Sequence, residues 1–223
     1  MEPIGYIYTD FDDKFGIPRQ SGLIDLPGII EFQPEYRQPE AFRGLEGYSH
    51  IWVLWEFSSL KREGFSATVK PPRLGGNRKM GVFATRSPYR PNPIGLSCLR
   101  LEKVEYTEKK GVLLHVSGVD MLNKTPIYDV KPYIAYTDSH PDAICGFADE
   151  VMDDNLKVIF PEELLNELPE KIRDKAIKLL ELDPRPHYID DPDRRYGVSY
   201  AGYDIRFKVV GDHLTVCEVE KLH

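Results

Sequence analysis

The densest concentration of reactive side chains lies in residues 84–97, ATRSPYRPNPIGLS. Arg86 and Arg90 can pair with a carboxylate or a phosphate, while Tyr89 and Asn92 add an aromatic ring and an amide. Because the three prolines of this segment fix the backbone, little conformational entropy is lost when a ligand binds. A structural loop uses prolines in the same way but seldom keeps two arginines and an asparagine among them. The pattern therefore predicts a binding loop.

The positive charge of the chain is concentrated around this loop. The whole sequence has a net charge of −7, yet residues 61–100 contain nine basic residues and one acidic residue. This basic block therefore carries +8, and the rest of the chain carries −15. Such a block can hold phosphates locally while the acidic remainder discourages non-specific binding to nucleic acid. The alternative is a solvated basic loop without a ligand.

Other polar positions are less specific by themselves. Residues 18–22, PRQSG, are typical of a turn with polar side chains. His50 begins an apolar run, where a histidine usually has a structural role. Asp120 and Asp129 lie in or beside apolar runs. Because an unpaired buried carboxylate is costly, hydrogen-bonded turn residues are the simpler interpretation of both. Residues 183–188, DPRPHY, repeat the combination of prolines with cationic and aromatic side chains.

Composition limits the class of protein. Cys98, Cys145 and Cys217 lie far apart without a C-x-x-C spacing, which predicts free thiols in a reducing compartment and no zinc site. The first residues are charged and lack the apolar core of a signal peptide, and no apolar run approaches the roughly 20 residues that span a bilayer. We therefore expect a cytoplasmic protein without a membrane segment or a bound metal.

The elements that must position these side chains are mostly strands before residue 135. Aromatic and β-branched residues dominate residues 3–9 and 49–57, and residues 94–106 and 111–119 flank a turn and predict a long hairpin. Residues 80–85 are short, apolar and strand-like. Many short strands separated by turn signals predict a β-barrel, and the G-x-G-x-x-G turn of a doubly wound α/β domain is absent from the sequence.

The C-terminal part of the sequence has a different character. Residues 169–182 place apolar side chains on one helical face, after a shorter helical turn at 161–167. Residues 203–209 and 214–219 predict two strands joined at Gly211. The predicted protein is mainly β and comprises a barrel-like domain over residues 1–137, an acidic linker over 138–160 and a small C-terminal α+β domain over 161–223.

Six segments closely resemble the motifs of one protein family. They are PRQSGL (18–23), FRGLEGYSHIWVL (42–54), PPRLGG (71–76), ATRSPYRPNPIGLS (84–97), GVDMLNKTPIYDVKPY (118–133) and DPRPHY (183–188). They occur in the order found in the TrmO family, whose members are tRNA (N6-threonylcarbamoyladenosine) N6-methyltransferases. The resemblance covers the chain to about residue 137 and reaches the C-terminal extension through the last motif. A long arginine- and proline-rich motif beside five others is highly specific.

The resemblance implies a β-barrel methyltransferase outside the Rossmann class that binds S-adenosylmethionine and works as a homodimer. Its substrate would be the threonylcarbamoylated adenosine beside the anticodon, in the anticodon loop of threonine tRNA. The implied cofactor pocket comprises Gln20, Ser21, Gly22, Phe57, Ser58, Arg86, Leu96, Ser117, Gly118, Val119 and Asp120. The chain departs from the family at Ser21, which replaces a proline, and position 58 varies within the family.

Specific roles follow for some of these residues. Arg86 is expected to pair with the cofactor carboxylate, and Phe57 is expected to stack on the cofactor. The candidates for substrate binding are Arg90, Asn92, Arg185 and Tyr188, and the candidates for catalysis are Asp183, Arg90 and Tyr89. Asp183 either orients Arg185 or acts as the catalytic base, and the sequence does not decide between these roles.

Two other functions are consistent with the same sequence features. One is an RNA- or nucleotide-binding barrel without enzymatic activity, and the other is a protein of the same fold that binds S-adenosylmethionine and acts on another RNA or a small molecule. The C-terminal domain argues against a small molecule because it supplies the cations Arg185, His187, Arg194, Arg195, Arg206 and Lys208. A C-terminal domain that only braces the dimer is the remaining alternative.

Overall fold

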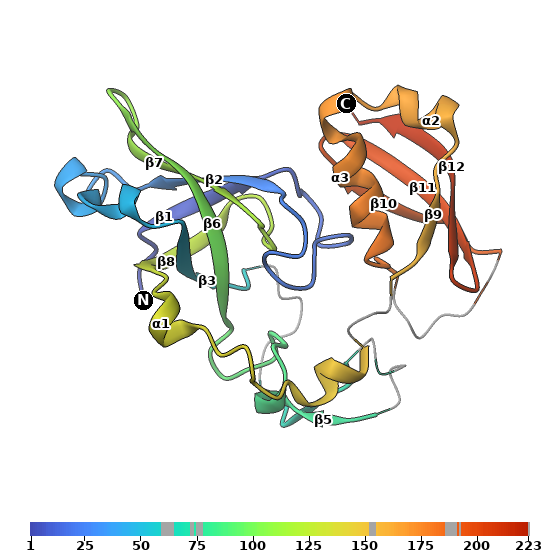
Figure 1. Cartoon of the computed structure of the whole chain (residues 1–223), viewed down its shortest axis with the longest axis horizontal. Helices are drawn as coiled ribbons and strands as arrows, with labels where there is room; N and C mark the ends of the chain where they lie inside the picture. The colour runs from blue at the N-terminus through green and yellow to red at the C-terminus, as the bar shows by residue number, and fades with distance from the viewer. Residues whose placement is uncertain are drawn as a thin grey trace.

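The computed structural model describes residues 1–58, 65–71, 74, 78–151, 155–185, 191 and 193–222. The chain forms a β-barrel from its first 132 residues and a separate α+β domain near its C-terminus (Figure 1). A connection that contains the short helix α1 (Ala135–Asp138) and the 3-10 turn Gly146–Val151 leads from one to the other. The predicted mainly β architecture is therefore confirmed.

The barrel is closed by six antiparallel strands in the order β1-β2-β7-β6-β3-β8. These strands are β1 (Gly5–Thr9), β2 (Pro27–Phe32), β3 (His50–Glu56), β6 (Ile94–Thr107), β7 (Gly111–Ser117) and β8 (Thr125–Pro132). β6 and β7 form the predicted hairpin, whereas β2 and β8 were not predicted as separate strands. Because closure pairs every strand on both sides, the described barrel leaves no free sheet edge.

The barrel core follows from the two-residue period of its strands. Along β3, Ile51, Val53 and Trp55 are buried and alternate with more accessible residues. Ile7 of β1 and Ile30 of β2 face each other in register and are fully buried in the same core. A one-residue slip of any strand would turn these side chains outward, so the apolar pattern fixes the register.

The binding loop is preceded by short elements instead of one strand. Residues 80–85 were predicted as a strand, but only Met80–Gly81 (β5) is extended, and it pairs with Thr68–Val69 (β4). Val82–Ala84 then forms a 3-10 turn, which Thr85 closes by donating both its backbone N–H and its hydroxyl to the Val82 carbonyl. The Val82 carbonyl is thus bonded within the turn and does not pair with a neighbouring strand. Two further 3-10 turns, Pro39–Phe42 and Leu45–Gly47, precede β3.

The C-terminal domain is a four-stranded sheet in the order β10-β11-β12-β9, covered by two helices. Its elements are β9 (Lys157–Ile159), α2 (Glu162–Glu167), α3 (Glu170–Glu181), β10 (Tyr196–Tyr200), β11 (Tyr203–Val210) and β12 (His213–Lys221). The helices and the last two strands match the sequence prediction, and β10 was not predicted. β9 lies inside the expected linker but pairs parallel to β12, so the sheet begins before residue 161. Across the described part of the chain, no helix is both long and apolar enough to cross a membrane.

The two domains meet where the loop after β1 lies against β10. The rings of Phe11 and Tyr200 are 5.7 Å apart, and both side chains are buried. The backbone N–H of Ala201 donates to the Asp10 carbonyl at 3.4 Å. Gly16 has φ +92°, and a Cβ there would lie 2.7 Å from a methyl group of Val198, so this approach requires glycine. The loop thereby covers an edge strand that would otherwise be open to pairing.

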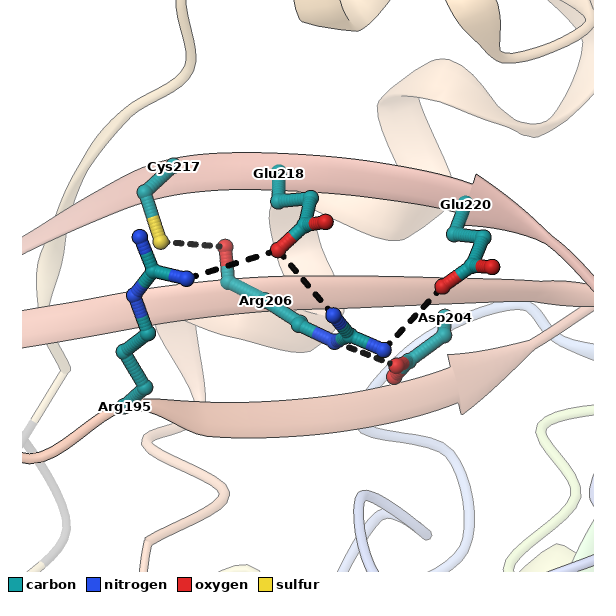
Figure 2. A network of polar contacts seen from close by, with 6 residues as sticks. All are labelled: Arg195, Asp204, Arg206, Cys217, Glu218 and Glu220. Carbon is teal, nitrogen blue, oxygen red and sulfur yellow. Dashed lines mark hydrogen bonds and ion pairs between the residues drawn. The ribbon is translucent and has the colours of Figure 1, made fainter.

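An ion-pair network occupies the face of the C-terminal sheet opposite its helices (Figure 2). Arg206 of β11 contacts three carboxylates: Asp204 at 2.9 Å, Glu218 at 3.1 Å and Glu220 at 3.1 Å. Arg195 approaches the same Glu218 oxygen at 3.5 Å. Two of the cations that were cited against a small-molecule substrate are thus paired with acidic neighbours in this sheet.

This network leads to a prediction about stability. In Arg206→Met, three carboxylates would face one another without their shared cation, so we expect a lower Tm at low salt. Because salt screens repulsion between exposed charges, the loss should shrink as ionic strength rises. Lys157→Met is the matched control because it removes one exposed ion pair, to Asp212, which contributes little to stability. Thermal unfolding measures both variants, and equal Tm values for them would contradict a network effect.

Candidate functional site

A turn near the N-terminus meets the end of β7 at one side of the barrel. The backbone N–H of Gly22 donates to the Gly118 carbonyl at 2.9 Å. Gly118 has φ +83°, and a Cβ there would lie 3.1 Å from Gly22, so both conformation and space require glycine. Ser21, which replaces the family proline, accepts a hydrogen bond from the Cys98 N–H through its hydroxyl at 3.1 Å. This hydrogen bond ties the turn to β6, whereas a proline would restrict the turn through its ring.

Asp120 lies next to this turn in a largely enclosed position. The Ser97 hydroxyl donates to its Oδ1 at 2.7 Å, and the Trp55 Nε1–H donates to the same hydroxyl at 2.9 Å. Burial raises the pKa of Asp120 from its ordinary value of 3.8 to about 6, against the opposing effects of Ser97, the Ser21 backbone N–H and the charge of Arg86. A buried carboxylate with hydrogen-bond donors and a raised pKa is typical of functional sites. The carboxylate is therefore available for a cationic ligand group.

Arg86 brings positive charge to the same place. Its guanidinium donates to the Gln20 side-chain carbonyl, which joins the binding loop to the 20–22 turn. Its charge acts on Asp120 strongly enough to oppose the rise of the Asp120 pKa. The turn thus contacts both a cation on the loop and an anion after β7. This arrangement can bind a ligand that carries both charges.

Two aromatic rings line the end of β3 next to these polar groups. Trp55 and Phe57 have ring centroids 4.2 Å apart at an interplanar angle of 55°. The Phe57 N–H donates to the Pro93 carbonyl at 2.9 Å, which ties β3 to the end of the binding loop. Gly95 lies directly on the Trp55 ring, where a Cβ would be 2.2 Å from the nearest ring atom. A side chain at position 95 would therefore displace Trp55 and its hydrogen bond to Ser97.

Gly95→Ala tests this packing. Because overpacking forces side chains or backbone to move, we expect a loss of about 1–3 kcal/mol in the free energy of unfolding. Displacement of Trp55 should also disturb the hydrogen bonds to Asp120. Gly47→Ala is the matched control, since nothing lies within 4 Å of a Cβ at that position. Chemical denaturation measures both variants, and equal stability would show that Trp55 is not held by Gly95.

The binding loop itself is held from within by Arg90. Its guanidinium donates to the carbonyls of Thr85 at 2.6 Å and Val82 at 3.1 Å, and lies 5.5 Å from the centroid of the Phe83 ring. Arg90 therefore stabilises the loop, whatever else it contacts. Asn92 is exposed between two prolines of the same loop.

The other predicted pocket residues contribute differently. Leu96 is 54% exposed, and Ser58 is exposed at the end of β3. The Ser117 hydroxyl donates to Glu102 at 2.5 Å, and the Val119 side chain is buried in the barrel core. At positions 117 and 119 the side chains are thus committed to the barrel, and only their backbone is available to a ligand.

The structure thus brings most of the predicted cofactor residues together. Hydrogen bonds connect Gln20 with Arg86, Gly22 with Gly118, and Ser21 with Asp120. Sequence analysis missed Ser97, the last residue of the 84–97 motif, and Trp55, which directly follows the 42–54 motif. The sequence contained one signal for Ser97, since it lies in an apolar predicted strand. A buried hydroxyl there needs a hydrogen-bond partner, which indicates a polar neighbour.

The second predicted loop lies at the end of α3. Asp183 is 5% exposed with φ +49°, and both of its oxygens accept from the Arg185 guanidinium, at 2.9 and 2.8 Å. The Arg185 backbone N–H also donates to Asp183 at 3.2 Å. Tyr188 and His187 lie outside the described residues. Asp183 thus contacts the Arg185 guanidinium through both of its carboxylate oxygens.

The closed barrel and the appended sheet with its two helices define a β-barrel class of protein with a C-terminal α+β domain. A model of the tRNA-methyltransferase O N-terminal domain matches residues 6–139, and a model of the TrmO C-terminal domain matches residues 153–222. The chain therefore belongs to the tRNA-methyltransferase O family, and the resemblance of its motifs is confirmed.

Individual relatives agree with this assignment. The chain is 36% identical to the Escherichia coli K12 tRNA (adenine(37)-N6)-methyltransferase over 99% of this chain and 97% of the relative. It is 44% identical to the Eikenella corrodens protein of the same name, over 73% of this chain and 91% of the relative. A crystal structure of TrmO from Pseudomonas aeruginosa superposes with a TM-score of 0.76 at 35% identity, covering 98% of this chain and 97% of that one.

Proposed function

We propose that this chain uses S-adenosylmethionine to methylate N6 of threonylcarbamoyladenosine beside the anticodon of threonine tRNA. Membership of the family makes it an S-adenosylmethionine-dependent tRNA methyltransferase that acts on adenine N6. The modified nucleoside and the particular tRNA are the finer parts of the proposal, and they rest on the motif resemblance. The observation that carries the proposal is the placement of Arg86 and Asp120 on either side of the 20–22 turn.

The pocket residues fit the chemical groups of the cofactor. S-adenosylmethionine has an amino-acid end with both charges, an adenine and a sulfonium, and when bound it supplies an electrophilic methyl group. We assign its carboxylate to Arg86 and its ammonium to Asp120, because each would form a charge-assisted hydrogen bond. The ring of Phe57, which packs on the buried Trp55, offers a face for the adenine or the sulfonium. The backbone of residues 20–22 and 117–120 completes the proposed pocket.

The residues proposed to contact the acceptor lie on the binding loop. Methyl transfer needs alignment of donor and acceptor within about 3–3.5 Å more than it needs a protein nucleophile. The Arg90 guanidinium already binds two loop carbonyls, and both Asp183 oxygens bind Arg185. We therefore propose Tyr89 and Asn92 as the acceptor contacts of this loop and Asp183 as a positioning residue for Arg185. The acceptor N–H must lose its proton, for which the carboxylate of the threonylcarbamoyl group is itself a suitable base.

The C-terminal domain is proposed to hold the tRNA through the loop after α3. Arg206 and Arg195 are engaged with acidic residues of their own sheet, so they are poor candidates for phosphate contacts. Arg185 stays our candidate, together with Tyr188. We also propose that the protein acts as a homodimer in the cytoplasm, as its motif resemblance implies. Sedimentation at working concentration tests the dimer.

The test of the proposed function is methylation of defined tRNA by the purified full-length protein. Threonine tRNA with and without the threonylcarbamoyl group is incubated with S-adenosylmethionine, and the digested nucleosides are analysed by mass spectrometry. We expect a gain of one methyl group on threonylcarbamoyladenosine and none on unmodified adenosine. Calorimetric cofactor binding without methylation of either tRNA would instead support a same-fold protein that acts on another RNA or a small molecule.

A further inference from the structure

Two exposed aromatic rings lie beside the binding loop and serve no evident purpose in the core. Phe83 is 70% exposed and Phe65 is 54% exposed. Their ring centroids are 6.2 Å apart and the ring planes are inclined by only 27°. Exposed phenylalanines cost hydration free energy, and a contiguous exposed apolar patch often marks an interaction site.

The local structure holds Phe83 outward. It lies in the 3-10 turn Val82–Ala84, in which Val82 is buried and anchors the turn. The Val82 N–H donates to the Ala67 carbonyl at 3.0 Å, and the Ser66 N–H donates to the Tyr89 carbonyl at 3.4 Å. These bonds connect the strand beside Phe65 to the loop that carries Phe83. The aromatic pair is therefore presented by two segments that support each other.

A fixed cation lies against this pair. The Arg90 guanidinium lies 5.5 Å from the Phe83 centroid and is fixed there by the carbonyls of Val82 and Thr85. The pair belongs to the 61–100 block, which has a net charge of +8 in a chain of net charge −7. Aromatic faces within a basic surface are the combination that binds unpaired nucleotides, because the rings stack on bases while the cations attract phosphates.

The position of the pair relates it to the proposed pocket. Phe83 precedes Arg86 by three residues, so their Cα atoms lie within about 11 Å of each other. Stacked bases are about 3.4 Å apart along a strand, so this distance spans at most about three nucleotides. A base resting on Phe83 thus belongs to the same loop of RNA as a base whose N6 reaches the cofactor.

We propose that Phe83, supported by Phe65 and Arg90, stacks on an unpaired base that neighbours the methylated adenosine. This inference rests on the proposed tRNA methyltransferase function and adds a positioning surface to it. The stacked base would hold the flanking strand so that the target adenosine enters the pocket. The occupant is a single-stranded segment of the substrate RNA.

The test compares Phe83→Ala, Phe83→Trp and Tyr136→Ala in the full-length protein. The probe is an RNA stem-loop of the anticodon arm with 2-aminopurine beside the target adenosine, since the fluorescence of this base reports stacking. We expect Phe83→Ala to weaken stem-loop binding about fivefold to a hundredfold. Phe83→Trp should restore binding, and Tyr136→Ala should leave it unchanged because Tyr136 is an 89% exposed aromatic residue outside the basic block. The affinity for S-adenosylmethionine should be the same in all variants.

The outcomes separate this inference from the proposed function. Unchanged RNA affinity and unchanged 2-aminopurine fluorescence in Phe83→Ala, with an active parent, would overturn the stacking surface alone. A shift from dimer to monomer in sedimentation, with intact RNA affinity per chain, would assign the ring to an interface between copies and also overturn it. A parent that binds cofactor but methylates no tRNA would overturn the proposed function.

Discussion

Replacement of Arg86 by alanine is expected to weaken S-adenosylmethionine binding about tenfold to a hundredfold. The substitution removes a charge-assisted hydrogen bond to the cofactor carboxylate, and such contacts contribute about 1.5–3 kcal/mol. It also removes the contact to Gln20, which orders the turn on the opposite side of the pocket. Isothermal calorimetry with the purified protein measures the change in Kd directly.

Two further variants show whether the effect belongs to this position. Arg86→Lys keeps the charge but loses the planar fork of donors, so we expect an intermediate affinity. Arg78→Ala removes another cation of the basic block, one whose guanidinium is paired with Glu150 at 3.0 Å. Cofactor affinity should be unchanged in that variant. An equal loss of cofactor affinity in Arg78→Ala and Arg86→Ala would show that Arg86 contributes only its positive charge and no specific contact.

The sequence predicted the strands with the clearest local signals. β3 carries Ile51, Val53 and Trp55 at every second position, and β6 and β7 flank a recognisable turn, so local pattern and tertiary burial agree. β9 has only three residues and pairs with a strand far along the chain, so no local pattern reveals it. In the sequence, β10 follows a stretch rich in arginine and aspartate, and its alternation of Tyr196, Val198 and Tyr200 was not recognised there.

The candidate site shows the same division between local and long-range information. The proline-fixed loop around Arg86 is a local feature, and the binding role proposed for it was inferred from residue types alone. The environment of Asp120 depends on side chains from β3 and β6, since Trp55 donates to Ser97 and Ser97 donates to Asp120. Only closure of the barrel brings these strands together. Sequence reasoning therefore preferred a structural turn for Asp120, and its raised pKa became visible only in the folded chain.

The cofactor affinity of the protein is expected to depend on pH through Asp120. Its pKa is raised to about 6 because burial disfavours the charged carboxylate. If the ionised form binds the cofactor ammonium, affinity should rise as pH increases through 6 and level off near pH 7. Below pH 6 the affinity should fall by up to tenfold for each pH unit, because the protonated Asp120 must release one proton before it can bind the ammonium. Calorimetry between pH 4.5 and 7.5 measures the curve.

The stability of the protein without cofactor should change in the opposite direction. The folded-state pKa of Asp120 lies above its ordinary value of 3.8, so the folded protein binds the proton more tightly than the unfolded chain. The free energy of unfolding should therefore decrease as pH rises from about 4 to 6, by an amount on the order of 2–3 kcal/mol from this group. The buried charge thus costs stability at the pH at which it would bind the cofactor.

Asp120→Asn separates these two effects. The amide cannot ionise, so cofactor affinity should be low at pH 7.5 and independent of pH around 6, whereas stability at pH 7.5 should equal or exceed that of the parent. Asp129→Asn is the matched control, since Asp129 is a more exposed carboxylate paired with Lys131 at 2.7 Å, and it should leave both curves unchanged. A variant at position 120 that loses stability but keeps its cofactor affinity would show that the carboxylate only braces the 20–22 turn. The combination of weaker binding with unimpaired stability is the result that identifies Asp120 as a cofactor ligand.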